Sequence, residues 1–115
     1  MMKKATKNRW IKALRSGEYE QGKIHLRDER DQFCCLGVLV DVELEGEWRA
    51  DAGDHGDYTV YLEGKFQDLE LDVALTQEVR EHVGLTLSEH VHLIKMNDGL
   101  DKSFDEIADW IERKL

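Results

Sequence analysis

The chain of 115 residues contains no proline, and its only two cysteines, Cys34 and Cys35, are adjacent. Neighbouring cysteines rarely reach the geometry of an unstrained disulfide, so the pair indicates reduced thiols rather than a disulfide framework. No apolar stretch approaches the roughly eighteen residues that span a bilayer, and residues 1–8 lack the apolar core of a signal peptide. We therefore expect a cytoplasmic protein that does not contact a membrane.

Positive charge is scarce after residue 32. Residues 1–32 carry nine Lys or Arg against five Asp or Glu, residues 33–115 carry seven against twenty, and the formal net charge is −9. An acidic body repels the phosphates of nucleic acids, so we expect no direct DNA binding. The basic N-terminal segment is suited instead to an anion or a phosphorylated ligand.

The length of the chain favours a single domain over residues 1–115, because two separate cores would each be too small to be stable. A domain of this size buries roughly two-thirds of its unfolded surface and needs no metal or disulfide to hold it together. We predict an α+β fold with four or five short helices packed on a small, mostly antiparallel sheet, and no cofactor.

The first half of the chain mixes helical and strand patterns. Trp10 and Leu14 share one face of an amphipathic helix that ends at Gly17, and alternation predicts a strand over residues 23–27. The apolar run 33–44 fits a strand or a helix, and we favour an extended start at Phe33 followed by a buried helix.

The second half begins with a loop that the glycines and carboxylates of residues 45–57 predict. Residues 58–62 and 67–73 alternate and predict a hairpin, and three helices should then begin near Thr76, near Thr86 or Ser88, and at Ser103. Leu87, Val91 and Ile94 recur at helical spacing in the second of these helices, which Asn97-Asp98-Gly99 should stop. The predicted core residues are Trp10, Leu14, Ile24, Leu26, Phe33, Cys35, Leu39, Val60, Val79, Val83, Ile94, Phe104, Ile107 and Ile111.

Catalytic and metal-binding patterns are weak. The two thiols lie in an apolar run, where burial raises the thiol pKa and suppresses reactivity, so we interpret them as core residues. The carboxylates and imidazole of residues 51–57 do not have EF-hand spacing and indicate a solvated acidic loop. His90 and His92 differ by two positions on a predicted helix, so they point to different faces and cannot bind one zinc ion together.

Residues 88–115 are similar in pattern to the first half of a helix-turn-helix. A recognition helix should then follow, but none does before Leu115, and the last helix carries several carboxylates. The pattern therefore does not favour sequence-specific DNA recognition.

One set of N-terminal residues is suited to ligand binding. Arginine forks, an aromatic ring and an amide suit a nucleotide or another phosphorylated ligand, through bidentate contacts and stacking. The candidate ligand-binding residues are Arg9, Arg15, Tyr19 and Gln21, with Lys23 and Arg27 nearby. The alternative is that these cations only balance the acidic body.

Three motifs carry a resemblance: WIKALRSGEYEQ at 10–21, FCCLGVL at 33–39, and NDG at 97–99 followed by SFDEIA at 103–108. They resemble those of a family of small uncharacterised proteins encoded largely by bacteriophages and prophages. The resemblance covers both ends and the central apolar run. It implies an accessory protein in a bacterial host cell that binds a host protein or sequesters a defence signal, and it supplies no site residues.

Together these observations predict a non-enzymatic binding protein that interferes with a host or anti-phage defence process. It would hold a small phosphorylated ligand or occupy a host protein, and it can form a homo-oligomer. One alternative is an acidic mimic of nucleic acid that inhibits a host DNA-binding protein. The other is a small enzyme that uses Cys34 or Cys35.

Overall fold

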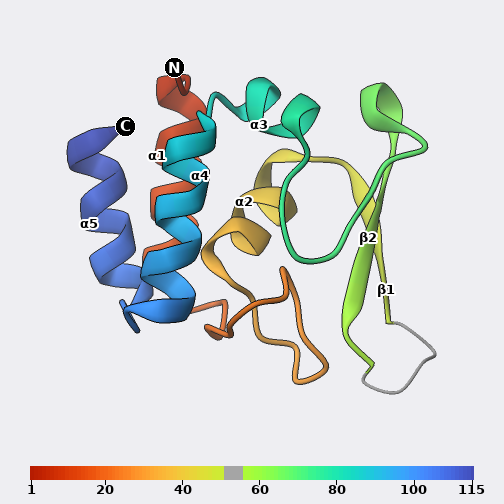
Figure 1. Ribbon diagram of the computed structural model, residues 1–115, viewed down its shortest axis with the longest axis horizontal. Coiled ribbons are helices and arrows are strands. Elements are labelled where there is room, and N and C mark those ends of the chain that lie inside the picture. Colours follow the sequence, from red (N-terminus) through yellow and green to blue (C-terminus); the bar gives the residue numbers. More distant parts are fainter. Residues whose placement is uncertain (51–55) are drawn as a thin grey trace.

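Five α-helices and a three-stranded antiparallel sheet make up the computed structural model, which describes residues 1–50 and 56–115. The elements are α1 Lys4–Arg15, α2 Cys35–Glu43, β1 Gly46–Ala50, β2 Tyr58–Leu62, η1 Gly64–Phe66, β3 Glu70–Leu71, α3 Gln77–Val83, α4 Leu87–Ile94, the π-helical turn η2 Lys95–Gly99 and α5 Phe104–Lys114. The helices lie on one side and the sheet on the other, with α2 between them (Figure 1). The predicted α+β class is confirmed, and no helix among the described residues is both long and apolar enough to cross a bilayer.

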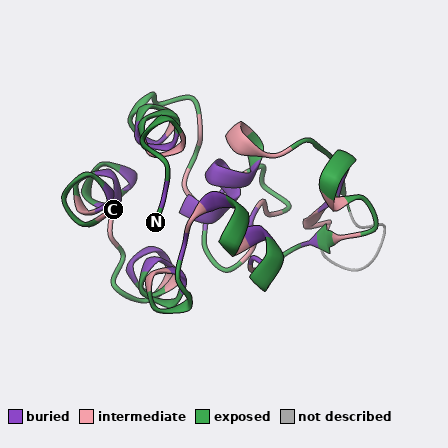
Figure 2. Cartoon of the chain, turned by 90° about the horizontal axis from the view of Figure 1, so that it is seen from above, coloured by how far each residue is buried: buried purple, intermediate pink, exposed green. Residues whose placement is uncertain are grey.

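Helix α1 packs against α2 and α5 through one apolar face. Trp10, Ile11 and Leu14 are buried, and the Trp10 indole Nε1–H donates a hydrogen bond of 2.9 Å to the carbonyl oxygen of Cys35. Gly17 follows the C-cap with φ +78°, the left-handed conformation that glycine adopts at low cost. The predicted helix end is therefore confirmed. Figure 2 shows helices end-on, with their buried sides turned toward one another.

Helix α2 occupies the centre of the core, and its residues from Cys35 to Val40 are all buried. A helix that is apolar all round must be surrounded by other elements, and α1 and α4 both pack against it. Phe33, just before the helix, forms isolated β-bridges with Gln21 and Arg27. The favoured interpretation of residues 33–44, an extended start followed by a buried helix, is confirmed.

The sheet has the order β1-β2-β3. Val60 pairs with Leu71 across β2 and β3, which confirms the predicted hairpin. Strand β1 was missed, because the expected loop 45–57 is wrong for residues 46–50, which pair with β2. Only Trp48 in β1 is even half-buried, so this edge strand lacks the apolar alternation that signals a strand. Residues 51–55 of the expected acidic loop lie outside the described residues.

The predicted strand over residues 23–27 is also wrong. Residues 23–26 form a series of bends, and Arg27 makes only an isolated bridge with Phe33. Ile24 has φ +71° and is 62% exposed, so its predicted place in the core is wrong as well. Leu26 is fully buried because its N–H donates to the Asp72 carbonyl and its carbonyl accepts from the Cys34 N–H. The alternation of apolar and polar residues over 23–27 therefore marks one buried side chain, that of Leu26, and not a strand in a sheet.

The C-terminal helices begin where their caps predict. Thr76 caps α3, and Thr86 and Ser103 form capping boxes with Glu89 and Glu106. The apolar residues at helical spacing in α4 do not all face the core: Leu87 and Val91 are 58% and 55% exposed, while Ile94, a predicted core residue, is half-buried and packs against the core. His90 and Leu93 face the core instead. The Asn97-Asp98-Gly99 segment does end the α-helix, but as part of a π-helical turn.

Candidate functional site

The two arginines predicted to bind an anion are paired with carboxylates of the acidic body. Arg9 donates to both carboxylate oxygens of Glu43, at 2.6 and 2.8 Å, and this contact holds the pKa of Glu43 below its usual range. Arg15 donates to Asp109 at 2.5 Å and to Glu112 at 2.9 Å. A phosphorylated ligand at either arginine would have to displace these carboxylates.

Tyr19 and Gln21 also have protein partners. The Tyr19 hydroxyl donates to Asp41 Oδ2 at 2.5 Å, and burial together with this carboxylate raises the pKa of the phenol. Gln21 Nε2 donates to the side chain of Asn97 at 3.0 Å and to the carbonyl oxygen of Lys102 at 2.7 Å. Arg9 and Tyr19 therefore contact α2, Arg15 contacts α5, and Gln21 contacts the π-helical turn η2 and the segment after it.

Asn97 is the centre of a buried polar network. Its Oδ1 accepts from Gln21 Nε2 and, at 3.2 Å, from the backbone N–H of Cys35 at the start of α2. Its Nδ2 donates to the Gly22 carbonyl at 2.8 Å and to Asp98 at 2.9 Å. One side chain thus joins three segments that are distant in sequence. The motif residues at 21 and 97 have a structural role, which the sequence alone did not reveal.

Arg27, which lies near the four candidate ligand-binding residues in the sequence, also has partners within the protein. Its guanidinium lies 4.0 Å from the centroid of the Tyr58 ring and 5.2 Å from that of Phe33, and it pairs with Asp31 at 2.5 Å. Cation–π contacts of this kind join a loop to a sheet. Arg27 therefore attaches the 23–33 segment to β2.

Both thiols are buried, as the sequence predicts. Burial raises the pKa of the Cys34 thiol to about 11 and that of Cys35 well above its usual range. The thiolate is the nucleophile in cysteine chemistry, so neither residue is activated at neutral pH. The thiols pack in the core.

The histidines on α3 and α4 are dispersed. His90 faces the core whereas His92 packs against Trp110, with ring centroids 4.9 Å apart, so the prediction that they face different ways is confirmed. Residues 1–50 and 56–115 contain no group of three or more His, Cys, Asp or Glu that could hold a metal ion.

His90 makes folding sensitive to pH. Its Nε2 accepts a 3.1 Å hydrogen bond from the backbone N–H of Leu75, which requires the neutral ring, and burial followed by the charge of Arg80 lowers the pKa of His90 below 6.5. A lowered pKa means that this stability is present above pH 6.5 and is lost as the pH falls through the lowered value. We expect the free energy of unfolding to fall as the pH drops below about 6.5, by at most about 1.4 kcal/mol per pH unit for one proton.

Urea denaturation at several pH values measures this effect. In His90→Gln the amide oxygen can accept from Leu75, and the free energy of unfolding should depend less on pH. His92→Gln, at an exposed position, should leave this pH dependence unchanged. If the free energy of unfolding of His90→Gln still changed with pH as in the unmodified protein, the pH dependence would belong to another group.

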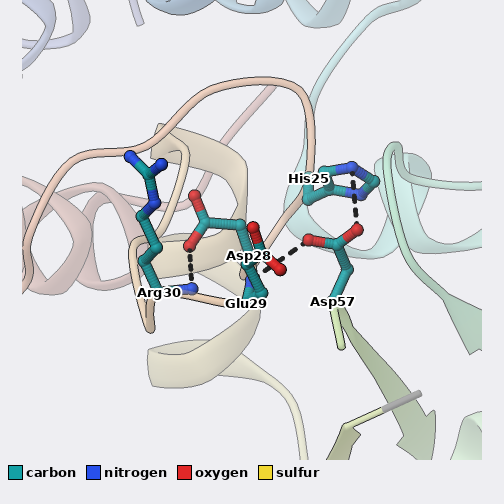
Figure 3. A pocket seen from close by; sticks show the side chains of 5 residues that line it. All are labelled: His25, Asp28, Glu29, Arg30 and Asp57. Atoms are coloured by element: carbon teal, nitrogen blue, oxygen red, sulfur yellow. Dashed lines mark hydrogen bonds and ion pairs between the residues drawn. The ribbon is translucent and has the colours of Figure 1, made fainter. Parts of the chain in front are cut away.

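A shallow cavity of about 370 Å³ lies between the 25–30 loop and the start of β2 (Figure 3). Asp57 accepts from the Glu29 N–H at 3.0 Å and lies 3.3 Å from His25 Nε2, while Asp28 accepts from the Arg30 N–H at 2.9 Å. The Arg30 side chain extends away from the His25–Asp57 pair in Figure 3. These polar atoms shape the loop rather than converge on a ligand.

The outer face of the sheet carries an exposed tyrosine among glutamates. Tyr61 pairs with Glu47 on one side and Glu70 on the other, and the next register position brings Glu45 beside Glu63 through a backbone hydrogen bond of 3.0 Å. All four glutamates are exposed, and Tyr61 is 36% exposed. We call these five residues the Tyr61 face. The sequence missed it because β1 carried no strand signal.

Arg49 borders the Tyr61 face. Its guanidinium lies 4.6 Å from the Tyr61 ring centroid and pairs with Glu47 at 3.0 Å. The protein thus already holds one cation against this aromatic and acidic surface.

Comparison with known proteins places the chain in a family without an assigned activity. Neither the search of curated proteins nor the search of solved structures gave a match. The model of DUF8296, a domain of unknown function, matches residues 2–115. The phage or prophage origin stays a prediction. The match spans nearly the whole chain, and the protein belongs to the DUF8296 family.

Proposed function

We propose that this protein is a non-enzymatic binding protein that occupies a basic surface of a partner protein through its Tyr61 face. The observation that carries the proposal is the position of an exposed tyrosine among four exposed glutamates on the open side of the sheet. Given the phage origin that the resemblance implies, the partner would be a host protein.

The charge distribution favours a basic partner over a phosphorylated ligand. Arg9 and Arg15, the cations best suited to a phosphate, are already neutralised by Glu43, Asp109 and Glu112. The remaining charge is dominated by carboxylates, since the net charge is −9. Carboxylates on one surface attract a complementary partner and accelerate its association.

Tyr61 gives the face an anchor that charge alone would not supply. Tyrosine and arginine are enriched among the residues that contribute most to protein–protein binding, because a tyrosine ring offers apolar area together with a hydroxyl. Its ring can receive a partner's lysine or arginine where Arg49 now lies. The surrounding glutamates would then pair with further cations of the partner.

An octalysine peptide is a suitable basic probe, and NMR titration at low salt should shift the signals of the Tyr61 face. Glu63→Lys combined with Glu70→Lys should weaken binding at least tenfold, a loss of about 1.4 kcal/mol. Glu18→Lys combined with Glu20→Lys makes the same change in net charge at exposed positions off the sheet and should weaken binding less than about threefold.

Two further variants separate site binding from general attraction. Arg49→Gln removes a competing cation and should tighten binding, whereas Tyr61→Ala should weaken it without unfolding the protein, since Tyr61 is exposed. Equal losses in the two charge-reversed proteins, or peptide shifts away from the sheet, would show that only net charge matters and would refute the Tyr61 face.

A further inference from the structure

A second cavity, of about 370 Å³, lies between the C-terminal end of α4 with its π-helical turn and the helix α5. These elements meet at the lower left of Figure 1. The lining residues used below are His92, Met96, Leu100, Lys102, Trp110 and Arg113. The volume falls in the range of pockets that hold small organic ligands.

Part of the cavity wall is aromatic and apolar, and the rest is charged. His92 and Trp110 contribute rings whose centroids are 4.9 Å apart and whose planes are tilted by 42°, and Met96 and the exposed Leu100 add apolar surface. Single π-helical turns often occur at functional sites because they displace side chains from the regular helical positions. Here the turn places Met96 on the cavity wall. A flat aromatic group is the ligand shape that such walls suit.

The carboxylates that line the cavity are already engaged. Asp109 accepts from Arg15 at 2.5 Å. Glu106 accepts from the Ser103 N–H at 3.0 Å in the capping box, and its other oxygen lies 3.9 Å from Lys102 Nζ. Neither carboxylate therefore repels an anion with its full charge.

The cations retain unused donors. Arg113 donates its Nε–H to the Asp109 carbonyl at 3.3 Å, and its two terminal nitrogens have no hydrogen-bond acceptor in residues 1–50 and 56–115. The Trp110 indole N–H also has no hydrogen-bond acceptor among the described residues, whereas the indoles of Trp10 and Trp48 each have one. A guanidinium with two free nitrogens binds a carboxylate, sulfonate or phosphate in bidentate fashion.

We infer that this cavity binds a small aromatic anion. The aromatic group would contact His92, Trp110 and Met96, while Arg113 and Lys102 would bind its acidic group. The site is formed by α4, its π-helical turn and α5, so it is independent of the Tyr61 face on the sheet. A negative result with octalysine would therefore refute the Tyr61 face and leave the cavity untouched, and a negative result with an aromatic anion would refute only the cavity.

Naphthalene-2-sulfonate is the probe, titrated into the intact protein and followed in ¹H–¹⁵N spectra. We expect the largest shifts at the Trp110 indole N–H and at residues 92–102 and 110–113. Arg113→Gln should weaken binding about tenfold without loss of fold, since the side chain is exposed. Arg30→Gln, a matched change at another exposed arginine, should leave the affinity unchanged.

A neutral probe tests the charge requirement. 2-Naphthol, with the same rings and no charge at pH 7, should bind at least tenfold more weakly than the sulfonate. Equal affinities for the two probes, or an unchanged affinity in Arg113→Gln, would overturn the anion site. Shifts confined to other parts of the molecule would overturn the cavity itself.

Discussion

Gly37→Ala is expected to abolish folding. A Cβ atom at Gly37 would lie 1.9 Å from the carbonyl oxygen of Leu26 and 2.7 Å from its carbonyl carbon. Both neighbours are backbone atoms, and α2 is the central helix of the core, so neither side can move without opening the structure. The loss should exceed about 4 kcal/mol, which is most of the stability of a domain at the lower end of the usual range of about 5–15 kcal/mol.

Circular dichroism during thermal and urea denaturation measures the Gly37→Ala result. Gly99→Ala is the matched control, because the nearest atom to its added Cβ is a lysine side-chain carbon at 4.0 Å. This control should change the stability by less than about 1 kcal/mol. A cooperative, native-like transition in Gly37→Ala would contradict the close approach of α2 to Leu26.

Asn97→Ala is expected to cost about 3–5 kcal/mol. The truncation removes the partner of the Cys35 N–H, of the Gly22 carbonyl and of the Gln21 amide, and it leaves a small cavity at a site that is 1% exposed. Each buried polar group without a partner costs about 1–3 kcal/mol. The loss should be large because the same side chain holds the 21–24 segment against α2.

Urea denaturation of two further variants gives this prediction its controls. Asn8→Ala lies on the exposed side of α1 and should leave the stability unchanged within about 0.5 kcal/mol. Asn97→Asp keeps an acceptor for the Cys35 N–H but loses the donor to Gly22 and adds a charge beside Asp98, so it should also destabilise. A loss below about 1 kcal/mol in Asn97→Ala would refute the role of the network.

Features that depend on neighbouring residues could be predicted from the sequence. The caps at Thr76 and Ser103, the helix end at Gly17 and the hairpin of β2 and β3 all involve residues close along the chain. The burial of Cys34 and Cys35 followed from an apolar run long enough to be surrounded on every side.

Features that depend on residues distant in the sequence could not be predicted from the sequence. Strand β1 exists because β2 offers it hydrogen bonds, and its own polar residues carry no alternation. Helix α4 turns His90 and Leu93 toward the core, where His90 accepts from the Leu75 N–H, and leaves the apolar Leu87 and Val91 exposed. The ion pairs of Arg9 and Arg15 have the same origin, since their partners Glu43, Asp109 and Glu112 lie far from them in the sequence.

The sequence by itself determined that this protein is an acidic α+β domain with buried thiols and well-capped C-terminal helices, because composition, caps and short-range periodicity act within a few residues. Only the tertiary structure decided which charges are neutralised and which surfaces remain free. Ion pairs such as Arg15–Asp109 join residues 94 positions apart, and the Tyr61 face requires three strands in register. No local pattern encodes such contacts, because their energy arises only after the distant segments have packed together.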